Sequence, residues 1–143
     1  MRAIVCGSRE FHSVTYAYLS STLGGMDLTE IISGGASGVD SYAVSYAKAK
    51  RIDYRVYYPD WLHQGKMAGP NRNARMLEEG QPDAVVAFWG TNGTANMMAQ
   101  ARALSVPVIE VPPDPATEWW RAKYRRGERN GNSGNLNLAT DSP

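Results

Sequence analysis

Short apolar runs alternate with longer segments of mixed polarity along the first 112 residues of the chain. Five runs have the length and composition of buried parallel strands: 2–7 (RAIVCG), 28–33 (LTEIIS), 53–59 (DYRVYYP), 83–90 (DAVVAFWG) and 106–112 (VPVIEVP). Between them lie helix-like segments over 13–24, 39–50, 70–80 and 94–105. This alternation predicts a Rossmann-like, doubly wound α/β fold, with a mainly parallel five-stranded sheet and helices on both faces.

Local signals refine the expected helices. Ser13 is the predicted N-cap of the helix over 13–24, and Thr94 that of the helix over 94–105. Pro70 suits the first turn of the helix over 70–80, and glycines suit the ends of two helices. The positions of 39–50 expected near one apolar side are Val39, Ala43, Tyr46 and Ala47.

The composition changes after Pro112. Residues 1–112 are expected to form one domain, and residues 113–143 a C-terminal extension. The extension has a possible short helix around 117–126, followed by an Asn/Gly/Ser-rich end with few apolar residues to bury. That end is therefore predicted to be mobile.

Composition excludes several classes of protein. The net charge of +1 over 143 residues does not fit a strongly basic nucleic-acid binder. A lone cysteine, Cys6, excludes an intrachain disulfide and fits a reducing cytoplasm. The N-terminal apolar run is too short for a signal peptide, and no stretch approaches the ~20 apolar residues of a membrane span. With only two histidines, His12 and His63, beside Cys6, neither a metal nor a cofactor is predicted.

Polar turns that contain glycine occur where strands are expected to end or helices to begin, in 7–10, 33–40, 69–76 and 89–96. Ligands bind at the carboxyl ends of strands in open parallel sheets, and a glycine turn that opens a helix presents backbone N–H groups to an anion. These turns therefore predict a site for a phosphate or a sugar. The candidate ligand-binding residues are Gly7, Ser8, Arg9, Gly34, Gly35, Ser37, Gly38, Asp40, Arg72, Asn73, Gly90, Gly93 and Thr94.

Several of these residues also have an ordinary structural interpretation. Arg9 could face solvent, Asp40 could stabilise a helix N-terminus, and Asn73 could hold a loop carbonyl. Arg75 is expected to pair with Glu79 one helical turn away rather than to contact a ligand.

Other residues are interpreted by their type and position. Cys6, Met97 and Met98 are expected to be buried. Tyr58, Trp61 and Trp89 stand near strand ends, where they could stack on a base or simply pack.

Four motifs, read in order, resemble the SLOG superfamily, and most closely its YspA-type branch: CGSREF, SGGASGVDSYA, GPNRNARML and DAVVAFWGTNGTANMMAQA. The resemblance spans roughly residues 2–111. It implies a Rossmann-like domain that binds a nucleotide or nucleotide-derived ligand in a pocket lined by these loops. Two related groups are the LONELY GUY phosphoribohydrolases and the DNA-processing protein DprA.

The resemblance to the phosphoribohydrolases is incomplete. Arg72 and Met76 match their R-x-x-x-M helix, and Gly93 and Thr94 match part of their G-G-x-G-T-x-x-E loop. The glutamate position of that loop is Met97, and a thioether cannot stabilise an oxocarbenium-like charge or position water. The motif therefore favours binding over hydrolysis, although Asp40 could supply a carboxylate from another loop.

The sequence thus predicts a cytoplasmic protein that senses or sequesters a nucleotide or NAD-derived small molecule, with a role in bacterial or phage nucleotide-signalling conflict implied by the superfamily. N-glycosidic hydrolysis of nucleoside monophosphates is the first alternative. Single-stranded nucleic-acid binding by the aromatic and basic segment 117–129 is the second. A homodimer or higher homo-oligomer is expected, with the apolar face of 94–104 as a candidate interface.

Overall fold

A computed structural model describes residues 1–118 of the chain, and in it five strands form one parallel sheet. The strands are β1 (Arg2–Cys6), β2 (Glu30–Ser33), β3 (Asp53–Val56), β4 (Ala84–Ala87) and β5 (Val108–Glu110). Their spatial order is β3-β2-β1-β4-β5, and all four neighbouring pairs are parallel. The predicted doubly wound α/β fold is therefore confirmed.

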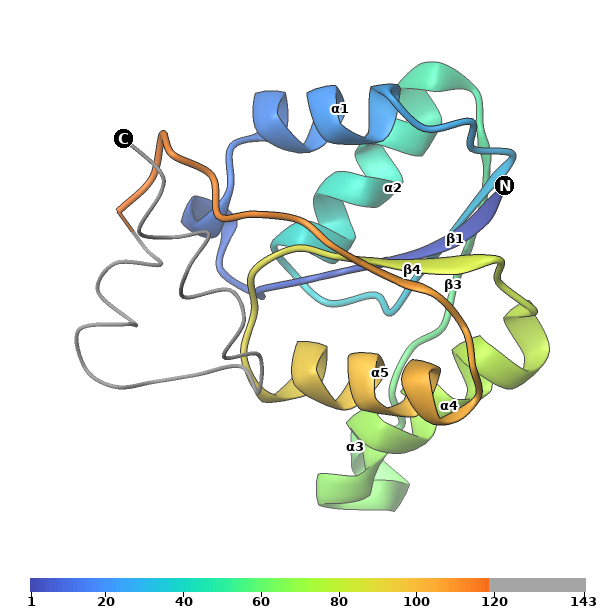
Figure 1. The fold of residues 1–143 in the computed structure, drawn as a ribbon. Coiled ribbons are helices and arrows are strands. Elements are labelled where there is room, and N and C mark those ends of the chain that lie inside the picture. Colours follow the sequence, from blue (N-terminus) through green and yellow to red (C-terminus); the bar gives the residue numbers. More distant parts are fainter. Residues whose placement is uncertain (119–143) are drawn as a thin grey trace.

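Helices cover both faces of the sheet (Figure 1). On one face lie α1 (Tyr16–Gly24) and α2 (Val39–Lys50), and on the other lie α4 (Ala68–Gly80) and α5 (Asn92–Ala103). Three short helices, η1 (Phe11–Ser13), α3 (Trp61–Gln64) and η2 (Gly65–Met67), lie in the connections.

The alternation of side chains along β1 produces a core on each side of the sheet. Ala3 and Val5 pack in the cluster that contains the buried apolar residues of α1 and α2. Ile4 and Cys6 pack in the other cluster, with residues of α4 and α5. Because successive strand residues point to opposite faces, a central strand needs the continuous apolar run that the sequence shows.

Helix boundaries follow the prediction closely, but two caps differ from it. The Oγ1 of Thr15, not of Ser13, accepts the capping hydrogen bond from the Tyr18 amide of α1 at 3.0 Å. Ser13 instead belongs to η1, where its hydroxyl donates to the Glu10 carbonyl. Thr94 lies inside the first turn of α5, which begins at Asn92, so Thr94 is not the cap.

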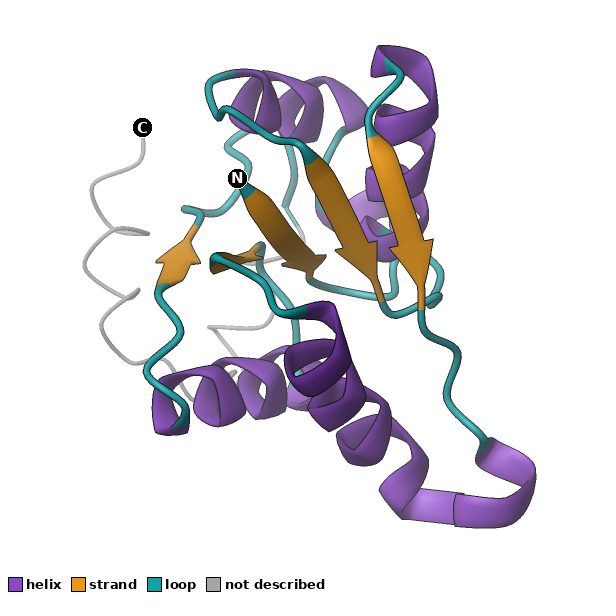
Figure 2. Ribbon diagram, turned by 90° about the vertical axis from the view of Figure 1, so that its right-hand side faces the viewer, coloured by secondary structure: helices purple, strands orange, loops and turns teal. Residues whose placement is uncertain are grey.

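The connection between β3 and α4 departs most from the expected loop. Asp60 caps α3 by accepting a hydrogen bond from the His63 amide, and its carboxylate also lies 3.0 Å from His63 Nδ1. Figure 2 shows this connection leaving the edge of the sheet beyond β3 and reaching a short helix that stands apart from the layers. Neither α3 nor η2 contains a buried residue.

The first residues of the extension bind back to the domain. Asp114 is buried, and its carboxylate accepts hydrogen bonds from both the amide and the hydroxyl of Thr15 at 2.7 and 2.9 Å. Thr117 donates to the Ser13 carbonyl. These bonds tie residues 113–118 to the start of α1, while most of the predicted helix over 117–126 and the predicted mobile end lie outside the described residues.

Within residues 1–118, none of the helices combines the length and the apolar character needed to cross a bilayer.

Candidate functional site

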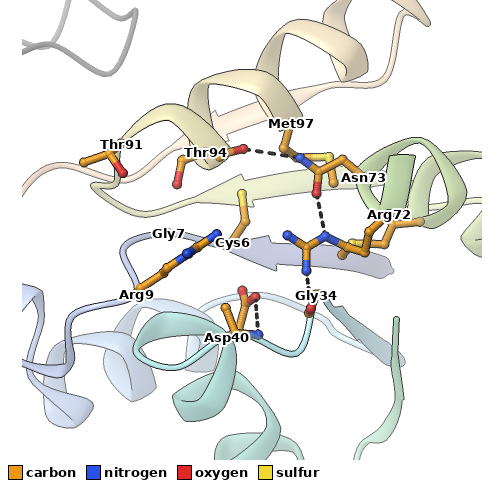
Figure 3. A pocket seen from close by; sticks show the side chains of 13 residues that line it. Cys6, Gly7, Arg9, Gly34, Asp40, Arg72, Asn73, Thr91, Thr94 and Met97 are labelled. Carbon is orange, nitrogen blue, oxygen red and sulfur yellow. Dashed lines mark hydrogen bonds between the residues drawn. The ribbon is translucent and has the colours of Figure 1, made fainter. Parts of the chain in front are cut away.

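A polar pocket of about 50 Å³ opens where the strand order reverses, at the carboxyl ends of β1, β2 and β4. Connections from β1 and β2 lead to α1 and α2 on one face, and the connection from β4 leads to α5 on the other, so loops from both layers meet there. The lining residues are Cys6, Gly7, Arg9, Gly34, Ala36, Asp40, Arg72, Asn73, Met76, Thr91, Gly93, Thr94 and Met97. Figure 3 shows Arg9 and Arg72 entering this pocket from opposite sides.

Arg72 on α4 is fixed by hydrogen bonds from its own guanidinium. Its Nε donates to the side-chain oxygen of Asn73 at 2.9 Å, and its Nη1 donates to the Gly34 carbonyl. Asn73 in turn donates to Asn96 and to the Gly93 carbonyl on α5. The side chain is only 8% exposed. A cation is therefore held rigidly between three elements, with Asn73 as its support.

Gly34 makes this position of Arg72 possible. An alanine Cβ at residue 34 would lie 2.7 Å from Arg72 Nη1, 2.9 Å from Arg72 Cζ and 3.0 Å from Asp40 Oδ2. These distances are below van der Waals contact for carbon. The glycine predicted from the turn pattern thus gives the guanidinium its space.

Asp40, in the first turn of α2, faces the two arginines as a carboxyl that is 7% exposed. Its Oδ2 accepts a hydrogen bond from the Ala36 amide at 3.1 Å. Burial raises the pKa of Asp40 to about 6, although the Ala36 hydrogen bond and the charges of Arg72 and Arg9 oppose that rise. Burial also lowers the pKa of Arg72, which Asp40 partly offsets.

This pKa shift predicts how stability depends on pH. The folded chain keeps the Asp40 proton up to about pH 6, whereas an unfolded chain releases it near pH 4. The resulting stabilisation is present below pH 4 and is lost as the pH rises through 6. Relative to Asp40→Asn, we expect the unsubstituted protein to lose on the order of 2 kcal/mol of unfolding free energy between pH 4 and pH 8.

Urea unfolding of both proteins across this range measures the difference, in which the titration of other carboxylates cancels. A difference that stays constant, or that favours the unsubstituted protein at higher pH, would contradict the assigned pKa.

Arg9, after β1, connects the polar pocket to a second cavity. Its side chain is exposed, and its positive charge lowers the pKa of both Asp40 and Arg72. Its guanidinium carbon also lies 5.6 Å from the ring centroid of Trp61, which is within the range of a cation–π interaction.

The second cavity, of about 300 Å³, shares Arg9, Ala36 and Arg72 with the polar pocket. Its remaining lining residues are Gly35, Ser37, Tyr58, Pro59 and Trp61. We call the part formed by Tyr58, Pro59 and Trp61 the aromatic wall.

The first turn of α5 forms one side of the polar pocket. Thr91, at the N-cap, makes no side-chain capping hydrogen bond, and Thr91, Gly93 and Thr94 all line the pocket. A helix N-terminus of this kind attracts an anion through its amides and its dipole.

The sequence predicted that backbone amides of the 33–40 turn face an anion, but two of these amides bind side chains of the protein itself. The Gly35 amide donates to the Ser33 hydroxyl at 3.3 Å, and the Ala36 amide donates to Asp40. Two amides that were candidates for phosphate binding therefore already have partners within the protein. The local polar side chains, Ser33 and Asp40, are the sequence signal for this arrangement.

The predicted site residues fall into three groups. Those around the polar pocket are Gly7, Arg9, Gly34, Asp40, Arg72, Asn73, Gly93 and Thr94, and those at the second cavity include Gly35 and Ser37. The structure does not bring Ser8, Gly38 or Gly90 into either lining.

Ser8, Gly38 and Gly90 have structural contacts instead. The Ser8 hydroxyl accepts from the Glu10 amide, and Gly90 lies against the Thr94 side chain. Gly38, with a φ of 74°, lets its loop approach the backbone of Ser8 and Arg9 too closely for any Cβ.

Thr91, Ala36 and Met76 line the polar pocket but were not among the predicted ligand contacts. Met76 could have been predicted from the R-x-x-x-M motif, whereas Ala36 has no polar side chain that would suggest contact with a ligand. Other expectations are confirmed: Arg75 Nε lies 3.4 Å from Glu79 Oε2, and Cys6, Met97 and Met98 are buried. Burial raises the pKa of the Cys6 thiol, which fits an inert side chain.

The face of α5 considered as an oligomer interface is occupied within the monomer. Met97, Met98 and Ala101 are buried in the core between α5, α4 and the sheet. That face is therefore not available to a second copy. The homo-oligomer stays a prediction, without the interface that the sequence suggested. Among residues 1–118, no group of three or more His, Cys, Asp and Glu side chains is arranged to hold a metal ion.

Comparison with known proteins gives one family. The sequence model of the YspA, cpYpsA-related SLOG family matches residues 1–63, which include β1 to β3 and the 33–40 turn. No curated protein and no solved structure matches the chain.

Proposed function

We propose that the chain, whose residues 1–63 match the sequence model of a SLOG family, binds a nucleotide or NAD-derived phosphorylated small molecule and does not turn it over. A sensor or sequestering protein in nucleotide signalling would have this property. The observation that carries the proposal is the pair Arg9 and Arg72, which face one pocket from opposite sides beside the start of α5.

In this proposal the phosphate lies against the first turn of α5. The amides of residues 92–94 and the guanidinium of Arg72 bind it, and Arg9 adds a second positive charge. Thr94 is buried with its hydroxyl at the pocket, where it can add a hydrogen bond. Asp40 accepts a hydrogen bond from a ribose hydroxyl, since the pocket, at about 50 Å³, is far too small for a whole nucleoside.

One observation favours a second candidate, hydrolysis of the N-glycosidic bond. Asp40 has a pKa of about 6, a value suited to proton transfer near neutral pH. Against it, Asp40 is the one acidic residue among the described residues that line the polar pocket, and Met97 occupies the glutamate position of the hydrolase motif. Glycosidases ordinarily need two carboxylates.

Isothermal titration calorimetry with the 5′-monophosphates of adenosine, guanosine, cytidine and uridine tests the proposal on the full chain. We expect at least one to bind with a dissociation constant in the micromolar range. Chromatography of the same mixtures after prolonged incubation should show no free base.

Failure of these four nucleotides, and of NAD and ADP-ribose in the same assay, to bind at millimolar concentration would contradict the proposed function. Release of free base at many turnovers per protein, lost in Asp40→Asn, would replace the binding proposal with the hydrolase. Mass spectrometry of small molecules that copurify with the protein would identify a natural ligand directly.

A further inference from the structure

The two adjoining cavities differ in size and in the side chains that line them. The polar pocket, of about 50 Å³, contains Asp40, Arg72 and the start of α5, whereas the second cavity, of about 300 Å³, is bounded by the aromatic wall. A volume of 50 Å³ is less than twice the share of one water molecule in the liquid. Sites for small molecules usually begin near 300 Å³, so most of any nucleotide must lie in the second cavity.

The aromatic wall exposes large apolar side chains at this cavity. Tyr58 is 68% exposed and Trp61 is 50% exposed, although a soluble domain ordinarily buries such rings. Neighbouring Leu62 and Met67 are exposed as well. Grouped exposed apolar side chains beside a polar cleft are typical of a surface that contacts a ligand.

Both rings lie against glycines, where no side chain separates them from the backbone. Tyr58 packs so closely on Gly35 that an alanine Cβ there would lie 2.6 Å from Tyr58 Cδ1. The tip of the Trp61 ring lies 3.6 Å from the Cβ position of Gly69 on α4. Pro59 restricts the backbone between them, and Asp60 caps α3, which carries Trp61.

Arg9 makes the two cavities parts of one site. It lines both cavities, and its guanidinium lies over the Trp61 ring. Its positive charge also lowers the pKa of Asp40 and that of Arg72. A ligand with its phosphate at α5 would therefore extend past Arg9 toward Tyr58 and Trp61.

We infer that the aromatic wall binds the planar base of the ligand by stacking, so that the ligand is a nucleotide with a base rather than a bare sugar phosphate. This inference rests on the proposed function and adds the recognition of the base to it. Stacking on an aromatic side chain tolerates any base, because every base has a π face. The wall is therefore expected to supply affinity, with discrimination among bases left to polar groups.

The test compares ribose 5-phosphate with the tightest-binding nucleoside monophosphate by calorimetry. Trp61→Leu and Tyr58→Leu should each weaken nucleotide binding about 10-fold and change ribose 5-phosphate binding less than 2-fold. Tyr54→Leu, which replaces a partly exposed tyrosine on β3 outside both cavities, is the matched control and should change neither. Because Trp61 and Tyr58 are largely exposed, circular dichroism of both variants should match the unsubstituted protein.

Two results separate this inference from the proposed function. If ribose 5-phosphate binds as tightly as every nucleotide, and neither wall variant changes that, the inference is wrong while the proposed function stands. If neither ribose 5-phosphate nor any nucleotide binds, the proposed function itself is wrong and the inference falls with it. Equal weakening of both probes in the wall variants would also overturn the inference, because it would indicate a general disturbance of the site.

Discussion

Arg72→Gln is expected to bind nucleoside monophosphates about 100-fold more weakly than the unsubstituted protein. Glutamine retains hydrogen-bonding groups but removes the positive charge and shortens the reach toward α5. Loss of one partner from a buried, charge-assisted contact costs on the order of 3 kcal/mol, which corresponds to about 100-fold in affinity. Calorimetry with the same nucleotides as above measures the change.

Arg75→Gln provides the control for Arg72→Gln. Arg75 lies on the same helix, one turn from the pocket residue, with its side chain half exposed and paired with Glu79. Exposed pairs of this kind contribute between 0 and 1 kcal/mol to stability, and Arg75 lines neither cavity. We expect less than a 2-fold change in affinity. Loss of binding in both variants to the same extent would show that Arg72 has no special role.

Gly34→Ala should lower nucleotide affinity more than 10-fold without removing any charged or polar group. The new methyl group would overlap the guanidinium of Arg72 and crowd Asp40, so Arg72 must leave its hydrogen bond with the Gly34 carbonyl. Misplacement of a rigid contact by about 1 Å is enough for such a loss. Gly34 does not have a positive φ, so alanine adds no backbone strain there.

Gly24→Ala is the matched control, because Gly24 lines neither cavity and an alanine Cβ there would make only an ordinary contact, 3.7 Å from Tyr46 Oη. Since Gly24 is the last residue of α1 and has no positive φ, alanine should fit its backbone without strain. We expect affinity within 3-fold of the unsubstituted protein. If Gly34→Ala also keeps full affinity, the position of Arg72 against Gly34 is not what the ligand requires.

Features that depend on local sequence were predictable. The five strands and the boundaries of α2 follow from apolar runs and periodicity, and the residues expected on the buried side of α2 are all buried. Gly34, Asp40 and Arg72 were expected at one site because parallel strands end at one edge of the sheet. These residues converge because of the topology of the sheet, and that topology is predicted by the alternation of strands and helices along the sequence.

Features that depend on tertiary contacts were not predictable. Ser13 and Thr15 are both suitable capping residues, and the choice of Thr15 involves Asp114, which lies 99 residues further along the chain. The segment between β3 and α4 has no apolar periodicity, because α3 and η2 bury nothing. The polar side chains of the 33–40 turn bind their own backbone, and the glycine pattern alone does not reveal that competition.

The lack of buried residues in α3 and η2 has a consequence for how this scaffold can diversify. Exposed positions outside a packed core accept substitutions at little cost in folding free energy. Trp61 belongs to this segment, whereas Arg72 belongs to the buried framework of α4. New ligand preferences could therefore arise by exchange of side chains in the outer connection, while the pocket around Arg72 stays unaltered and the domain keeps its folding stability.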